Sequence, residues 1–439
     1  MSLGSFIRRN IYWVNDFFNK SPIRKQYNDI KSILDNKNDV GFFVQKQYIE
    51  KILKHAVQHT RFYSGCNPNN IETFPIINKI IIQENYDNYK VDILHIPEHS
   101  GGLFTQRTSG STGTPFAVLH DSRKRKRRIA ELKYFGKIIG FQSHEKLVQL
   151  RAWNSWQSKT KSQSIKENII PIDISNLNDG KFAELCHIIK NKKAIALRGY
   201  ASSIDLIAQY VKSNNIQLPS LKIIIAGSET LLDSTRVLVT QYIGCNIISQ
   251  YANEENGILA QESIKNKGAE NHFYLNHASY YFEIFKLDKD EPASFGELGR
   301  IVVTDLFNYA MPLIRYDTGD TGIMLESDEY SNGFPVLSKL YGRRLDLIYD
   351  RHNNPVHPMA IGRILKNYPD IVQWQFIQKN QSKYLLKIKT ADMEKSEDCM
   401  EKLKELLGGA DVVINMELVD EITVLASGKR KPVVNEWKR

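Results

Sequence analysis

The chain has 439 residues, of which 42% are hydrophobic and 25% are charged, and its formal net charge is +10. That composition is typical of a globular protein, and the length is too great for one ordinary core, so we expect two or three domains. The chain has four widely scattered cysteines and no CxxC pair. They argue against disulfides and a zinc site and predict reduced thiols in a cytoplasmic protein.

The first predicted element is an amphipathic helix, "SFIRRNIYWVNDFFNK". Charged residues run through it, so it cannot span a bilayer, and we expect no signal peptide. The favoured interpretation is a helix packed on its own domain, and the alternative is a helix on a membrane surface. The apolar positions at helical spacing are Phe6, Ile7, Ile11, Val14, Phe17 and Phe18.

The remainder of the first hundred residues is predicted to be helices and loops. A Ser/Thr/Gly loop, "TSGSTGTP", then follows the short extended segment "GLFTQR". Glycines let the backbone turn tightly, and hydroxyls with exposed N–H groups form a concavity suited to phosphate oxygens. The loop lacks the GxxxxGK[ST] pattern of P-loop NTPases. By itself it is equally consistent with a flexible turn.

The densest basic run, Arg123–Arg128, follows a candidate helix N-cap at Asp121 and Ser122. A positive charge suits nucleic acid, a membrane surface or an anionic small molecule. The run has no interleaved aromatic residues, and the chain has no RNA-binding or helix-turn-helix signature, so we expect no nucleic-acid partner. The run is either a solvated helix face or a contact for a phosphorylated cosubstrate.

Strands and helices alternate after this run. The strand patterns are "KLVQLRAW", "AIALRGY", "LKIIIAG" and "CNIISQY", and helical patterns such as "SSIDLIAQYVKSN" and "LLDSTRVLVTQYIG" lie between them. Continuous apolar strands alternating with helices indicate a parallel sheet covered on both faces. "YYFEIFKL" and "LGRIVVTDL" then predict a β-rich region. After Gly342 the pattern is that of a small α+β unit, so the predicted domains are residues 1–342 and 343–439.

Polar motifs follow the predicted strands, where open α/β sheets bind ligands. Taken alone, several of them have an ordinary structural explanation: Asp320 could be a turn acid and Glu255 a surface carboxylate. Lys429 is one of several basic residues in its region, and Lys431 is an alternative to it. In chain order the motifs are "IAGSET" with Gly227, Ser228 and Glu229, "SQYANEENG" with Tyr251 and Glu255, "IRYDTGD" with Asp320, "YGRRLDLI" with Arg343, and "ASGKRK" with Lys429.

Taken together, the order and spacing of these motifs resemble those of the adenylate-forming ligases. Within that superfamily the chain most resembles the phenylacetate-CoA ligase branch and its CapK-like members, which are associated with capsule and surface-polysaccharide synthesis. The resemblance covers about residues 100 to 430. It rests on "RTSGSTGTP", "RGYASSIDLIAQYV", "YANEE", "RYDTGD", "GRRLD" and "SGK".

The resemblance implies a role for each motif. Tyr251 would stack on the adenine base, and Gly227, Ser228 and Glu229 would line its slot. Asp320 would bind the ribose hydroxyls, Arg343 would contact ribose or phosphate, and Glu255 would hold Mg²⁺. Lys429 would bridge the substrate carboxylate and the nucleotide. The β- and γ-phosphates of ATP would be cradled by Thr108, Ser109, Gly110, Ser111, Thr112, Gly113 and Thr114.

Three departures from the family pattern bear on the substrate, on domain movement and on metal content. Ala252 replaces the usual glycine after the tyrosine, and Glu254 stands where relatives commonly have Ser or Thr, so the acyl pocket should differ. Leu345 stands at the hinge position that is Asp or Lys in many relatives. Some phenylacetate-CoA ligases carry a Cys/His metal site, but His272 and His277 have no cysteine nearby in the sequence, so we predict no zinc.

The expected fold is therefore α/β, with a large N-terminal ATP- and carboxylate-binding domain and a small mobile α+β lid carrying Lys429. The expected reaction is activation of a carboxylate as acyl-AMP with release of pyrophosphate, followed by transfer to coenzyme A. Transfer to an amine, with amide formation in surface-polysaccharide synthesis, is the alternative. A non-enzymatic interaction protein on the same fold also stays open. A homodimer is possible, and the sequence specifies neither the acid nor the acceptor.

Overall fold

The computed structural model describes residues 2–36, 40–107, 116–151, 160–174, 179–264, 271–343, 348–353, 355–356, 358–365, 367–368, 370–390, 396–409, 411–422 and 432–437. The chain divides into two compact units. The N-terminal unit comprises residues 1–318 and 322–340, and the C-terminal unit comprises residues 319–321 and 341–439.

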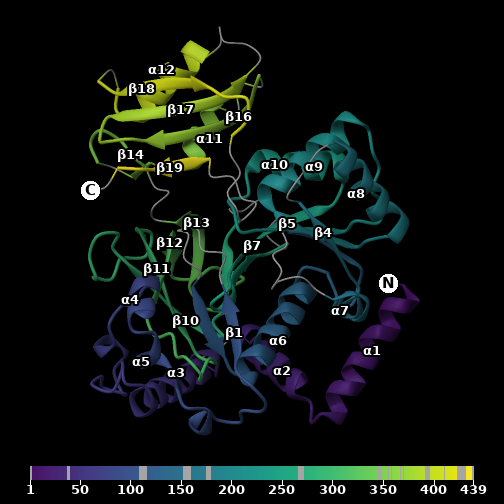
Figure 1. Ribbon diagram of the computed structural model, residues 1–439, viewed down its shortest axis with the longest axis vertical. Coiled ribbons are helices and arrows are strands. Elements are labelled where there is room, and N and C mark those ends of the chain that lie inside the picture. The colour runs from purple at the N-terminus through teal and green to yellow at the C-terminus, as the bar shows by residue number, and fades with distance from the viewer. Residues whose placement is uncertain are drawn as a thin grey trace. The chain divides into compact units, whose positions relative to one another are not determined.

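An 11-stranded mixed sheet forms the framework of the N-terminal unit, with the strand order β10-β11-β12-β13-β9-β8-β7-β6-β5-β3-β4 (Figure 1). One part of it is parallel, as the alternating pattern predicts, from β4 to β7. Its strands are β3 (Leu147–Arg151), β4 (Ile169–Asp173), β5 (Ala196–Tyr200), β6 (Ile223–Gly227) and β7 (Asn246–Asn253).

Helices cover one face of the parallel strands (Figure 1). Leu150, Leu197 and Ile224 point into an extensive apolar cluster on that face, together with side chains of α8 (Asp179–Lys192) and α9 (Ala201–Ser213). The predicted helix before Gly244 begins at Asp233 as α10 (Asp233–Leu238) and continues as the π-helical turn η3 (Val239–Ile243). Gly244 closes it with φ +76, the left-handed conformation that favours glycine at a helix end.

The opposite face of the parallel strands carries a smaller apolar cluster. It contains Ala196 of β5, Ile225 of β6, Ile248 of β7 and Ile139, which follows α6 (Ser122–Ile138). Because strand side chains alternate between faces, each parallel strand contributes to both clusters. The parallel sheet is thus buried on both sides, as expected for continuous apolar strands.

The β-rich part of the N-terminal unit completes the large sheet. Strands β7 and β8 form an antiparallel hairpin, β8 pairs with β9, and β9 pairs with β13. These strands are β8 (Gly257–Glu262), β9 (Phe273–Leu275), β10 (Tyr280–Phe285), β11 (Leu298–Asp305), β12 (Tyr316–Leu325) and β13 (Val336–Arg343). Both strands predicted here, "YYFEIFKL" and "LGRIVVTDL", are present as β10 and β11.

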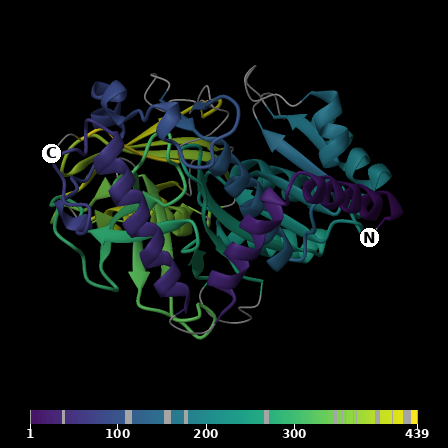
Figure 2. The ribbon, with the colours of Figure 1, turned by 90° about the horizontal axis from the view of Figure 1, so that it is seen from below.

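Helices and short turns make up the first hundred residues, as predicted. The helices are α1 (Leu3–Phe18), α2 (Pro22–Leu34), α3 (Val40–His59), α4 (Lys79–Glu84) and α5 (Tyr86–Tyr89), and the 3₁₀ turns are η1 (Ile71–Thr73) and η2 (Ile93–His95). The hairpin of β1 (Phe104–Arg107) and β2 (Ala117–His120) follows, and α7 (Lys161–Glu167) lies between β3 and β4. Figure 2 shows the purple N-terminal helices running along one side of this unit.

The first helix packs on its own domain, as the favoured interpretation of its pattern predicts, but the apolar side chains of the pattern do not form the packed face. The residues of α1 that are buried are Ser5 and Asp16, whereas Ile11, Phe17 and Phe18 are 63%, 70% and 79% exposed. The helix packs on its domain, but through the face opposite to the one that the apolar pattern predicts. No helix among the described residues is both long enough and apolar enough to cross a membrane.

The C-terminal unit has its own sheet and core. Four strands are arranged in the order β18-β17-β16-β19, with β16 and β17 antiparallel and both outer pairs parallel. Its elements are β14 (Ile348–Tyr349), β15 (Pro355–Val356), α11 (Pro358–Leu365), β16 (Ile371–Gln378), β17 (Lys383–Thr390), α12 (Ser396–Leu406), β18 (Val413–Leu418) and β19 (Val433–Asn435). Ile361, Phe376 and Leu403 lie in the cluster that joins helices to sheet.

Candidate active site at the carboxyl ends of the parallel strands

The parallel strands reverse their order of addition at β3. The chain places β4 on one side of β3 and then β5, β6 and β7 successively on the other. In open α/β sheets, ligands bind beyond the carboxyl ends of the strands at such a switch point. The residues that end these strands, Arg151, Tyr200 and Gly227, therefore mark the expected position of a site.

The motif Gly227-Ser228-Glu229 turns away from this edge. Gly227 pairs with Tyr200 on one side and with Gln250 on the other, and Ser228 adopts a left-handed φ of +66. Glu229 Oε2 accepts a hydrogen bond of 2.9 Å from the backbone N–H of Ser202. Tyr200, the N-cap residue of α9, makes no capping hydrogen bond with its side chain. Glu229 therefore provides an acceptor for an N–H group in the first turn of α9 that has no acceptor within the helix.

Tyr251 and Glu255 lie on the β7–β8 hairpin. Tyr251 is buried in β7, immediately before a register irregularity at Ala252. Glu255 follows in the turn and is only 7% exposed. Its carboxylate accepts a hydrogen bond of 3.3 Å from the hydroxyl of Tyr316, so the hairpin turn is tied to β12.

His120 fixes the backbone of Glu255. Its Nε2 lies 2.7 Å from the carbonyl oxygen of Glu255. Burial, with further repulsion from Arg128 and Lys124, holds the pKa of His120 well below its usual value. The imidazole is therefore neutral near pH 7, and its Nε2–H donates to that oxygen.

A magnesium ion fits this position only with help from a ligand. Glu255 offers a hard carboxylate oxygen of the kind Mg²⁺ prefers, together with phosphate oxygens and water. Among the described residues, no group of three or more His, Cys, Asp and Glu side chains could hold a metal ion. The protein would thus supply few of the ligands, which is the usual arrangement when Mg²⁺ arrives with a nucleotide.

Glu254 connects three segments that border the site. Its carboxylate lies 2.6 Å from a guanidinium nitrogen of Arg151, accepts a hydrogen bond of 2.5 Å from Gln106, and lies 3.8 Å from Arg128. Gln106 is in β1, Arg128 in α6, and Arg151 ends β3. Sequence reasoning singled out Glu254 as a departure from the family pattern but missed these partners, although the strand-end position of Arg151 was visible.

The basic run Arg123–Arg128 is neither a solvated face nor one continuous patch. Lys124 is fully buried, with its ammonium 2.5 Å from a carboxylate oxygen of Asp305 and 3.0 Å from the hydroxyl of Tyr280. Arg127 is equally buried and lies 2.5 Å from Asp29. Lys124 and Arg127 therefore join α6 to distant parts of its own unit.

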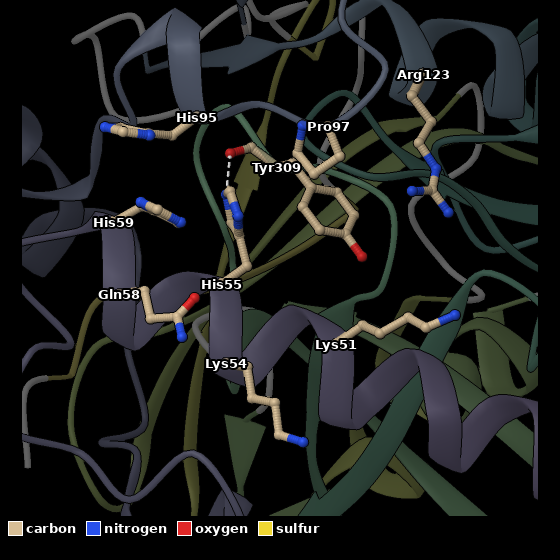
Figure 3. A pocket seen from close by; sticks show the side chains of 9 residues that line it. All are labelled: Lys51, Lys54, His55, Gln58, His59, His95, Pro97, Arg123 and Tyr309. Carbon is tan, nitrogen blue, oxygen red and sulfur yellow. Dashed lines mark hydrogen bonds between the residues drawn. The ribbon is translucent and has the colours of Figure 1, made fainter.

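Arg123 instead lines a pocket of about 370 Å³ beside α3 (Figure 3). The other lining residues are Lys51, Lys54, His55, Gln58, His59, His95, Pro97 and Tyr309. Figure 3 shows His55 directed at the backbone of Tyr309, whose carbonyl oxygen lies 2.9 Å from its Nε2. Burial lowers the pKa of His55 to about 4, so the ring is neutral and donates this bond. None of the predicted site residues lines this pocket.

The remaining predicted residues lie in less informative places. Asp320 is partly buried in β12, after Gly319 with φ +77, in the short segment that groups with the C-terminal unit. Arg343 ends β13, but its side chain is outside the described residues. Lys429 and the whole predicted phosphate loop, Thr108 to Thr114, also lie outside them. His272 contacts Asp328 at 2.9 Å, and His277 contacts the carbonyl of Pro335 at 3.0 Å.

Residues 348–436 match the family model of the CapK C-terminal domain. The chain is 25% identical to Protein CapK of Staphylococcus aureus over 449 residues, which covers 96% of this chain and 95% of that protein. Among solved structures it is similar to a 2-hydroxyisobutyryl-CoA ligase in the postadenylation state, with a TM-score of 0.73, 15% identity, and coverage of 92% and 91% of the two chains.

The chain is CapK-like and has the fold of the adenylate-forming ligases. This chain is also similar to a phenylacetate-coenzyme A ligase of Thermus thermophilus. The two are 27% identical over 158 residues, which cover 35% of this chain and 34% of that protein. The family resemblance and the α/β fold class inferred from the motifs are thus confirmed. The roles of the individual site residues of the CapK-like chain stay predictions.

Proposed function

We propose that this chain is an AMP-forming ligase that activates a carboxylic acid as acyl-AMP, releases pyrophosphate, and transfers the acyl group to coenzyme A. The observation that carries the proposal is the likeness of nearly the whole chain to a CoA ligase whose structure holds an acyl-AMP. The partial likeness to a phenylacetate-coenzyme A ligase supports the same acceptor.

The proposed nucleotide site lies at the carboxyl edge of the parallel strands. Gly227, Ser228 and Glu229 would line the adenine slot, with Tyr251 against the base. Asp320 would accept hydrogen bonds from the ribose, and Arg343 would contact ribose or phosphate. Residues 108–114 would hold the β- and γ-phosphates. Residues 343–439 would form the lid that brings Lys429 over the reacting groups and excludes water.

The residues of the chain solve one electrostatic problem. An ionised carboxylate needs no general base, but it must approach the α-phosphorus of a polyanion. The ammonium of Lys429 would stabilise the charge that develops there, because a fixed cation acts most strongly on transition-state charge in a dry site. Glu255, held by His120 and Tyr316, would bind Mg²⁺, which supplies charge neutralisation at the phosphates.

An amine acceptor is the alternative, since Protein CapK is the relative with which the chain aligns over most of its length. The amide would then form in surface-polysaccharide synthesis. A cytoplasmic location fits either acceptor, because the reaction consumes ATP in both cases.

Pyrophosphate exchange tests the first half-reaction. The purified chain would be incubated with ATP, Mg²⁺, labelled pyrophosphate and a panel of carboxylic acids. Acid-dependent label in ATP supports the proposal, and no exchange with any acid would count against it. Adding coenzyme A or amines to an active mixture, with mass spectrometry of the product, then identifies the acceptor.

A further inference from the structure

Arg198 occupies the centre of β5, beside the switch point of the sheet. The strand register places it opposite Gln149 of β3 and Ile225 of β6, so these side chains project from one face. The apolar cluster on this face includes Ala196 of β5 but not Arg198. Toward the carboxyl ends the lining of this face changes from apolar to polar, starting with Gln149 and Arg198.

The guanidinium of Arg198 has no partner among the described residues. Its Nε is closed off from solvent yet makes no hydrogen bond. Burial, with no opposite charge to offset it, lowers the pKa of Arg198 to about 10. The segment 152–159, which continues directly from β3, contains no Asp or Glu that could serve as a counter-charge.

Three other arginines of this unit with little or partial exposure are paired with an acid. Arg151, on the same face, contacts Glu254 at 2.6 Å, Arg300 contacts Asp317 at 2.8 Å, and Arg315 contacts Glu283 at 3.1 Å. The side chain of Arg198 is partly exposed, and a cation that is partly withdrawn from water without a counter-charge is unfavourable. Arg198 is thus suited to receive its anion from a ligand.

We propose that Arg198 binds a second anionic group of the acid substrate, so that the acids activated by this chain carry two negative groups. One carboxylate is adenylated, and the other group, a carboxylate or a phosphate, is held by Arg198. This inference rests on the proposed function and adds a substrate class to it. A planar guanidinium donates two parallel hydrogen bonds to either group, and the amide of Gln149 beside it can donate another.

Matched acids test this specificity in the exchange assay. Dicarboxylic acids of three to six carbons would be compared with their monoamides, and hydroxy acids with their O-phosphates. The wild-type chain should prefer the doubly charged member of a pair. Arg198→Met should reduce that preference by tenfold or more, with the KM for ATP unchanged, while Arg198→Lys should retain part of it. The exposed Arg61→Met serves as the matched control.

The outcomes separate the two proposals. Two outcomes overturn the role of Arg198 but leave adenylation intact. One is exchange only with acids that carry no second charged group, and the other is an equal loss of exchange activity for both members of a pair in Arg198→Met. No exchange with any acid speaks against adenylation. In that case the test of Arg198 is thermal stabilisation of the chain by the dicarboxylates and phosphates. Stabilisation that is lost in Arg198→Met but kept in Arg61→Met supports the anion site. If the wild-type chain is not stabilised by these anions, the anion site is overturned.

The exposed face of α1 carries a second, independent inference. Seven large apolar side chains occur at helical spacing along one side of the helix and are all at least 46% exposed. They are Leu3, Phe6, Ile7, Ile11, Val14, Phe17 and Phe18. An exposed apolar face this long is unusual on a monomeric protein and marks an interaction surface.

The other face of α1 anchors the helix to its unit. The buried carboxylate of Asp16 accepts hydrogen bonds of 3.0 and 2.9 Å from the backbone N–H groups of Ile23 and Arg24. Trp13 packs beneath the guanidinium of Arg24, at 3.9 Å from the ring centre. The apolar face is therefore presented by a fixed helix and does not result from a frayed end.

Charge selects the partner of this face. Lys20, Arg24 and Lys25 are exposed and follow Phe17 and Phe18 closely in the sequence, and the acid of α1 itself, Asp16, is buried and engaged. The whole chain carries a net charge of +10. A second copy would bring an equally basic surface, whereas an anionic bilayer is complementary to both the apolar and the basic side chains.

We infer that α1 lies in the surface of an anionic lipid bilayer, with its apolar side chains in the acyl region and its basic flank at the headgroups. Flotation with vesicles of phosphatidylcholine, with and without 30% phosphatidylglycerol (roughly the anionic share that gives a strong surface potential), tests this. Phe17→Ser/Phe18→Ser should weaken binding to the anionic vesicles at least tenfold. Leu94→Ser/Ile165→Ser, which changes exposed apolar residues elsewhere, should not.

Binding to the anionic vesicles should also fall in high salt, because the basic flank contributes to it. Equal binding by the Phe17→Ser/Phe18→Ser variant would overturn the inference. So would a lipid-free dimer in sedimentation velocity that this variant dissociates, since the face would then be covered by a second copy.

Discussion

Arg151 and Glu254 form an ion pair of 2.6 Å that joins the carboxyl end of β3 to the β7–β8 hairpin. Gln106 contacts the same carboxylate from the end of β1. The pair thus brings together three chain segments at the switch point of the sheet. It also explains a departure from the family pattern, because a Ser or Thr in place of Glu254 could not form ion pairs with both Arg151 and Arg128.

The first prediction concerns this pair. Glu254→Gln should lower kcat/KM for pyrophosphate exchange by tenfold to a hundredfold, because small displacements near reacting groups have effects of that size. Both side chains are about one quarter exposed, so the stability should change by no more than about 1 kcal/mol. Arg151→Gln should have the same effect, and the double variant should be no worse than either single one. Additive losses would show that the two residues act separately.

Lys429 should matter for one half-reaction only. Lys429→Ala should reduce acyl-adenylate formation by on the order of a hundredfold or more, as expected when a partner of transition-state charge is lost. Consumption of preformed acyl-AMP should change far less. Lys431→Ala, two residues away, is the matched control. Equal losses in both half-reactions, or a larger loss in Lys431→Ala, would contradict the assignment.

Asp320 should contribute to nucleotide binding. Asp320→Ala should raise the KM for ATP by about tenfold to a hundredfold, the effect of losing hydrogen bonds to a charged group. Asp317→Ala is a useful comparison, since Asp317 is bonded to Arg300 at 2.8 Å and should affect stability instead. An unchanged ATP dependence in Asp320→Ala would identify it as a turn residue.

Acid should destabilise the N-terminal unit through its buried histidines. Burial lowers the pKa of His277 to about 4, against an ordinary value near 6.5 in the unfolded chain. Below pH 6.5 the unfolded chain therefore binds a proton that the folded chain does not, so this contribution to stability is full above pH 6.5 and is lost as the pH falls to about 4. Burial also lowers the pKa values of His55 and His144 to about 4.

Urea denaturation at pH 7 and pH 5 measures this effect. His277 alone should account for about 2 kcal/mol of lost stability at pH 5, since one pKa unit corresponds to about 1.4 kcal/mol. His277→Gln should show a correspondingly smaller difference between the two pH values. The exposed His187→Gln should behave like the wild type. If the two variants responded alike, the burial of His277 would not govern its protonation.

The buried pair of Lys124 and Asp305 should be a large contributor to stability. Lys124→Met leaves the carboxylate of Asp305 out of water without its cation, which typically costs about 3–5 kcal/mol. Adding Asp305→Asn removes the unpaired charge, so the double variant should recover part of that loss. Denaturant midpoints provide the measurement. A double variant less stable than Lys124→Met would show that Asp305 has a further role.

Local patterns predicted the parallel sheet well, because apolar runs such as "LKIIIAG" can be buried on both faces in few other ways. Gly244 was likewise predictable as a helix end. The orientation of α1 was not, since a hydrophobic pattern shows which residues share a face but not what covers that face. The basic run was misjudged for a similar reason: Asp29 and Asp305, which pair with Arg127 and Lys124, are distant in the sequence.

The same distinction between local pattern and long-range contacts applies to the candidate site. Motif order identified the family, and the motifs lie where the strand pattern predicts, with Gly227 at the end of β6, Tyr251 in β7 and Glu255 in the turn after it. Their roles stay predictions. The partners of Glu254, and the lack of a partner for Arg198 among the residues that the structure describes, depend on strand register, which single motifs do not encode.

The hydrogen bond from Ser202 to Glu229 has one further consequence. It joins the loop after β6 to the first turn of α9, and α9 follows directly from β5, which carries Arg198. The loop proposed to recognise the nucleotide and the strand proposed to select the acid are therefore joined through this hydrogen bond. Weakening this hydrogen bond, as in Glu229→Gln, should therefore alter recognition of both substrates together, whereas a change confined to the side chain of Arg198 should alter acid recognition alone.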